Sequence, residues 1–126
     1  MAKKIFRFRG MTLEELQKLS LNDLLPFLTA DVRRKVKRGF TEQEQKFMAK
    51  LEKKSGVKTH CRDMVILPSM VSKTVKLARG NSFDDIVIQP EMIGHRLGEF
   101  VFTRKRVTHG SAGVGASRSS ANQSKK

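Results

Sequence analysis

Three side chains in the segment EMIGHRLGEF could do chemistry together: Glu91, His95 and Glu99. On an unbroken helix, their spacing of four residues would align a carboxylate, an imidazole and a second carboxylate along one face. Such a set could transfer protons or bind a metal ion. The segment therefore raises the hypothesis of a small hydrolase, whose activity would be lost on His95→Ala.

Two glycines in the same segment argue against that arrangement. Gly94 and Gly98 each destabilise a helix by about 1 kcal/mol relative to alanine, and Pro90 favours one short helical turn. No H-E-x-x-H, C-x-x-C or clustered aspartate pattern supplies further ligands. We expect no catalytic residue, no metal and no cofactor. Gly94 and Gly98 are instead interpreted as structural turn positions, with a positive φ or a close approach to another surface.

Charge is the strongest signal in the composition. The chain has 126 residues, with 26 Lys and Arg against 12 Asp and Glu, and a formal net charge of +14. This length predicts one domain plus tails, and this charge predicts a polyanionic partner, because a free protein would repel itself. Nucleic acid is favoured over a membrane or a small-molecule substrate, since no basic amphipathic helix with an aromatic face is present. A single cysteine and the absence of a secretory segment predict a cytoplasmic protein.

Periodicity divides the chain into three parts. Residues 1–56 are expected to form a helical basic region, with capping boxes at Thr12 and Thr41. Residues 57–106 are expected to form an α+β RNA-binding core, with strands at 57–61, 73–78 and 83–89. Residues 107–126 are expected to form a flexible basic tail. The predicted fold is α+β: a small antiparallel three-stranded sheet packed with helices, a helical N-terminal extension and an extended basic C-terminal tail.

Several basic groups are candidates for contact with RNA. The run Arg33-Arg34-Lys35-Val36-Lys37-Arg38 is too dense for a merely solvated helix face, because like charges one turn apart repel. Arg104-Lys105-Arg106 opens the tail in the same way, whereas the lone histidines His60 and His109 fit ordinary surface positions equally well. Aromatic residues rarely alternate with these cations, so we expect contacts with folded RNA and its phosphates rather than with unpaired bases.

Two segments in the centre of the chain resemble a known protein family. The segments THCRDMVILPSMV (59–71) and PEMIGHRLGEF (90–100), with Thr103-Arg104, closely resemble the ribosomal protein S19 family in its archaeal and eukaryotic form. The resemblance implies a ribonucleoprotein of the small ribosomal subunit that contacts ribosomal RNA in the subunit head and supports translation. It also implies a neighbour of the S13 family, and a tail that reaches toward the decoding region and transfer RNA.

The resemblance carries residue roles with it. It implies that Lys58, His60, Arg62, Lys76, Arg79, His95, Arg96 and Arg104 face RNA, and that Gly80 is the turn glycine of the hairpin. Ser72 departs from the family pattern, which usually has glycine there. The full set expected to contact RNA is Arg33, Arg34, Lys35, Lys37, Arg38, Lys58, His60, Arg62, Lys76, Arg79, His95, Arg96, Arg104, Lys105, Arg106 and His109.

These observations favour a structural, RNA-binding ribosomal component that is not an enzyme. Its lysines and arginines would displace counterions from folded RNA while the neutral centre holds them in register. The alternative is a free basic DNA-compacting protein. That alternative predicts similar affinity for any duplex and gives no reason for the neutral, specific segment 59–103.

Overall fold

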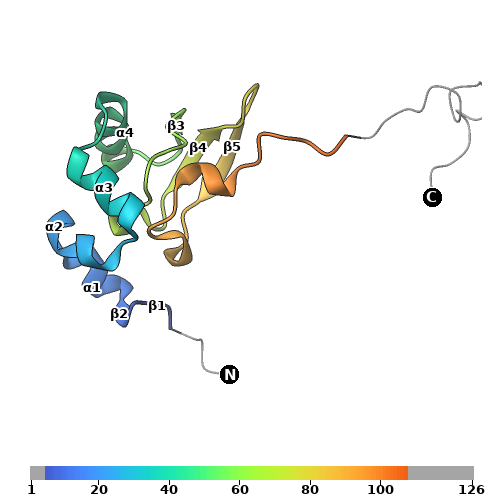
Figure 1. Ribbon diagram of the computed structural model, residues 1–126. Helices are drawn as coiled ribbons and strands as arrows, with labels where there is room; N and C mark the ends of the chain where they lie inside the picture. Colours follow the sequence, from blue (N-terminus) through green and yellow to red (C-terminus); the bar gives the residue numbers. More distant parts are fainter. Residues whose placement is uncertain (1–4, 108–126) are drawn as a thin grey trace, which may run out of the picture.

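The computed structural model describes residues 5–107, and the first half of this range is mainly helical. Figure 1 shows α1 to α4 along one side of the molecule and the three-stranded sheet on the other. In chain order the elements are β1 (Arg7–Phe8), β2 (Met11–Thr12), α1 (Leu13–Lys18), α2 (Leu21–Leu24), η1 (Leu25–Phe27), α3 (Ala30–Arg38), α4 (Glu42–Lys53), β3 (Val57–Thr59), η2 (Pro68–Met70), β4 (Thr74–Ala78), β5 (Phe83–Val87), η3 (Pro90–Met92) and η4 (Leu97–Phe100).

Local capping explains where the helices begin. The amide of Thr12 donates to the Glu15 carboxylate at 2.8 Å, and the amide of Thr41 donates to the Glu44 carboxylate at 2.9 Å. Both contacts satisfy amides that a helix start leaves unpaired. At the other end, α3 stops at Gly39, whose φ of +93° suits glycine. The predicted capping boxes are therefore confirmed.

The sheet corrects one part of the predicted fold. The α+β class and the three strands are confirmed, but the sheet is mixed rather than antiparallel. β4 and β5 form the expected antiparallel hairpin, whereas β3 pairs with β4 in parallel. Parallel neighbours need a crossover of a dozen or more residues. Residues 60–73 supply it, because they pass through the buried run 64–67 and η2 before β4 begins.

A second, smaller sheet was not predicted. β1 and β2 form an antiparallel hairpin within the region expected to be helical. Its two turn residues, Arg9 and Gly10, both have positive φ values, of 48° and 89°. A two-residue turn with positive φ values matches the twist of the two strands that it joins. Arginine in place of the usual asparagine at the first turn position concealed the signal.

One hydrophobic core joins the helices to the sheet. It contains Leu16, Leu24 and Val32 from the helical part as well as Val75 and Leu97 from the later elements, all almost fully buried. The burial of these side chains is the main source of stability. No helix among the described residues is long and apolar enough to cross a membrane.

Candidate nucleic-acid interface

The segment 90–100 is two short 3₁₀ turns joined by a bend, not one helix. Gly94, at the bend, has a φ of +83°. Its amide donates to the Ile66 carbonyl at 3.1 Å, and the Ile66 amide donates to the His95 carbonyl at 2.8 Å. The bend is therefore fastened to the buried run beside it. Gly94 has the predicted positive φ, and the helical alignment of Glu91, His95 and Glu99 does not form.

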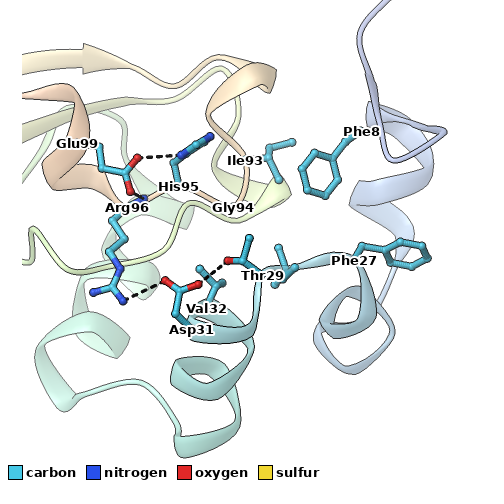
Figure 2. A pocket seen from close by; sticks show the side chains of 11 residues that line it. Phe8, Phe27, Thr29, Asp31, Val32, Ile93, Gly94, His95, Arg96 and Glu99 are labelled. Carbon is cyan, nitrogen blue, oxygen red and sulfur yellow. Dashed lines mark hydrogen bonds and ion pairs between the residues drawn. The ribbon is translucent and has the colours of Figure 1, made fainter.

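Glu99 holds the bend from the other side (Figure 2). One of its carboxylate oxygens lies 2.8 Å from His95 Nδ1, and the other accepts the Arg96 amide at 3.3 Å. The His95 ring also makes an edge contact with Phe100. Within residues 5–107, no three His, Cys, Asp or Glu side chains lie close enough to hold a metal ion. The arrangement can shape a turn and present an exposed imidazole.

Arg62 ties three segments together. Its guanidinium donates to the carbonyls of Ala78 at 2.6 Å, Gly98 at 2.8 Å and Val101 at 2.6 Å. Gly98 makes this possible, because a Cβ there would lie 3.0 Å from the Arg62 carbonyl oxygen. The close approach predicted for Gly98 is thus made to another part of the chain. The donors of Arg62 serve the fold, and so we do not place this side chain among the main contacts of a nucleic acid.

Arg96 is also used inside the protein. It pairs with Asp63 at 2.5 Å. It also pairs with Asp31 at 3.5 Å, as Figure 2 shows. The hydrogen bond from Arg96 holds the pKa of Asp63 below its ordinary value, and Asp63 in turn raises the pKa of Arg96. The pKa of Asp31 is lowered mainly by a hydrogen bond from Thr29. These contacts fix the bend against α3.

Lys35 completes the same internal network. Its ammonium group pairs with the buried carboxylate of Glu44 at 2.7 Å and donates to the Asp63 carbonyl at 2.7 Å. Burial raises the pKa of Glu44, but hydrogen bonds from Lys35 and from the Thr41 amide more than offset it, and the pKa lies below its ordinary value. Lys35 therefore points toward α4, unlike its neighbours on α3.

The hairpin cations are paired as well. Lys76 lies 3.6 Å from Asp85, and Arg79 lies 3.1 Å from Asp84. Gly80, in the turn between β4 and β5, has a φ of +114°. This value supports the interpretation of Gly80 as the turn glycine. The two cations are half exposed, so their pairs are weak and can be exchanged for contacts with an external anion.

The remaining predicted cations have no carboxylate partner among residues 5–107. Arg34, Lys37 and Arg38 are exposed and share one face of α3, opposite the buried Val32. Arg33 is half buried and donates to the Leu28 carbonyl. The exposed, unpaired set is Arg34, Lys37, Arg38, Lys58, Arg104, Lys105 and Arg106. This set can bind phosphates without first breaking an internal ion pair.

Some residues fall outside these groups. His60 is exposed and contacts Phe83, a residue that sequence reasoning did not select. The contact depends on both strand registers, because Thr59 pairs with Leu77 and Ala78 pairs with Phe83, so no local sequence signal identifies it. His109 lies outside the described residues, as do the parts of the tail beyond residue 107.

Comparisons with known proteins show the family of this chain. Residues 34–109 match the family described as ribosomal protein S19. The chain is also similar to small ribosomal subunit protein uS19 from Picrophilus torridus, with 51% identity over 118 residues. That alignment covers 93% of this chain and 78% of the archaeal protein.

Proposed function

Because this chain belongs to the ribosomal protein S19 family, we propose that it is a structural constituent of the small ribosomal subunit and binds ribosomal RNA there. Its role is architectural rather than catalytic. The relative from Picrophilus torridus carries the name of a small-subunit protein, and the match extends over nearly the whole chain. RNA is a polyanion, and binding it would offset the self-repulsion of a chain with a net charge of +14.

One observation carries the RNA-binding proposal: some cations are paired with carboxylates inside the fold, whereas others are exposed and have no carboxylate partner among residues 5–107. Lys35, Arg79 and Arg96 are paired with carboxylates that hold the folded centre together. The exposed cations of α3 and of residues 104–106 have no such partners in the described chain. Their counterions are released when phosphates replace them, and this release drives binding.

The finer placement rests on the family resemblance. The proposal places the chain in the subunit head, beside a protein of the S13 family. Its tail would approach the decoding region and transfer RNA. Residues 104–106 support the last point, because they leave the folded body as an extended basic chain after η4 (Figure 1). Translation in the cytoplasm is the setting that this placement requires.

A charge-matched experiment tests the proposal. The triple variant Arg34→Gln, Lys37→Gln, Arg38→Gln removes the unpaired face of α3, and the control triple Lys18→Gln, Lys53→Gln, Lys54→Gln removes the same charge elsewhere. Filter binding to a small-subunit ribosomal RNA transcript is measured over a salt series. Each lost phosphate contact reduces the log–log salt slope by about 0.9 on a duplex, so the α3 triple should reduce it by more than 2 and the control by much less.

The rival function gives a different result. A DNA-compacting protein binds unrelated duplex DNA as tightly as the ribosomal transcript, and both triples weaken it equally. The full chain should also travel with the small subunit through a sucrose gradient and remain there at high salt. Release into bulk nucleic acid in that gradient contradicts the ribosomal role.

A further inference from the structure

A hollow of about 300 Å³ lies between α4 and β3, and its rim is basic. Lys46 and Lys50 from α4 and Lys58 from β3 line it, with Phe47 and His60 beside them. No carboxylate from residues 5–107 lines this hollow, whereas the hollows on either side of Arg96 each contain carboxylates. Its charge therefore suits an anion, and its apolar and aromatic lining suits a flat ring.

Two of the three lysines are available to an anion. Lys46 pairs with Glu42 one turn away on the exposed face of α4. Lys50 and Lys58 have no carboxylate within 4 Å among residues 5–107 and are exposed. They stand on different elements, one on the helix and one on the strand. A chain of phosphates could therefore be held on both sides of the hollow.

The imidazole of His60 is held in place beside this hollow. Its ring meets the Phe83 ring edge to face, with centroids 5.1 Å apart and planes at 75°. Lys58 Nζ lies 5.3 Å from the centroid of the same Phe83 ring. Ala78 pairs with Phe83 in the sheet register, and its small side chain leaves room for this contact. An edge-to-face contact covers at most one face of the imidazole, so His60 can present an open face to the hollow.

We propose that this hollow holds an unpaired nucleobase of RNA, stacked on His60, with neighbouring phosphates on Lys50 and Lys58. The inference rests on the proposed RNA-binding function and adds a mode of recognition to it. Lysines alone would suit a duplex backbone, but an oriented ring in the wall adds the π surface on which unpaired bases stack. The sequence favoured contacts with phosphates over unpaired bases, because aromatic residues rarely alternate with its cations, whereas the fold brings Phe83 to His60 from a distant part of the chain.

Two short oligonucleotides test the base directly. One is a heptauridylate with 2-aminopurine at its centre, and the other has an abasic ribose at that position. Stacking of one base is worth about 5- to 150-fold in affinity, so the full chain should prefer the first oligonucleotide by that factor and quench its fluorescence. His60→Ala should remove the preference, and His60→Phe should retain it. Lys53→Ala, at an exposed position near the end of α4 that does not line the hollow, should leave the preference unchanged.

A second variant separates the role of Phe83 from folding. Phe83→Leu keeps an apolar side chain and removes the ring against which His60 rests. It should reduce the preference for the base while leaving the circular dichroism spectrum and the thermal midpoint close to those of the wild type. An unchanged preference in this variant contradicts the part of the inference that assigns Phe83 to orient His60.

The outcomes distinguish this inference from the proposed function. If the wild type binds both oligonucleotides equally, yet prefers the ribosomal RNA transcript to a scrambled transcript, the base site is absent and the proposed function stands. If it has no preference for the ribosomal transcript, the proposed function fails. If His60→Ala retains the base preference but weakens retention on isolated small subunits, the hollow holds a protein side chain, and the nucleobase inference is overturned.

Discussion

Replacing Arg62 should destabilise the fold far more than it weakens RNA binding. Its guanidinium bonds to three carbonyls that are 16, 36 and 39 residues away in sequence. A hydrogen bond to a charged group contributes about 1.5–3 kcal/mol. Because Arg62 is only half buried, water can replace part of each bond, so we halve the sum. Arg62→Met should then reduce the free energy of unfolding by about 2–4 kcal/mol.

Urea unfolding followed by circular dichroism measures this change. With a slope of about 1–3 kcal/mol per molar urea, the midpoint of Arg62→Met should fall by about 0.7–4 M. Arg62→Lys should fall by less, because an ammonium group keeps the charge but cannot match the planar fork of donors. Arg34→Met, on the exposed face of α3, is the control and should leave the midpoint unchanged. A stable Arg62→Met with greatly weakened RNA binding would refute the reasoning.

Three further substitutions test other features by the same unfolding assay. Ser72 has a φ of +69°, so Ser72→Gly should stabilise the protein by about 1 kcal/mol; a loss of stability contradicts the assigned strain. Gly98→Ala places a Cβ 3.0 Å from the Arg62 carbonyl and should destabilise by about 1–3 kcal/mol; a neutral effect means that the backbones can separate. Glu44→Gln should destabilise by about 1–3 kcal/mol at pH 7, below the full value for a buried pair because Lys35 is partly exposed. The pKa of Glu44 is lowered in the folded state, so its contribution is present above its ordinary value of 4.5 and is lost as pH falls through the lower folded value. The difference between Glu44→Gln and the wild type should therefore shrink in acid, and a constant difference contradicts the assigned pairing.

Local signals in the sequence predicted the helices and the β4–β5 hairpin well. Capping boxes and the glycine after α3 depend on residues close in sequence, and their geometry follows from side chains that are visible in the pattern. The direction of β3 could not be predicted, because it depends on the path of residues 60–73 through the core. A short apolar run does not show which end of the sheet the chain will reach.

The candidate site was harder to predict for a similar reason. The sequence shows that Arg62 and Arg96 are cations, but their partners lie in distant segments. Whether a guanidinium binds a carbonyl, a carboxylate or a phosphate depends on these partners. The run on α3 was easier, because its unpaired residues follow the helical period and lie opposite the buried Val32. The sequence therefore identified the exposed cations of α3 better than it identified the internal partners of Arg62 and Arg96.

The distribution of acidic residues connects the fold to its proposed partner. A net charge of +14 makes the chain repel itself wherever its cations have no carboxylate beside them. Asp63 and Glu44 lie beside Arg96 and Lys35, where the helices meet the bend at Gly94. Pairing there reduces repulsion within the folded centre and leaves uncompensated cations on exposed faces, where the proposed RNA partner would relieve their repulsion. The same pairing orients α3, so these internal carboxylates determine where its unpaired cations face an external anion.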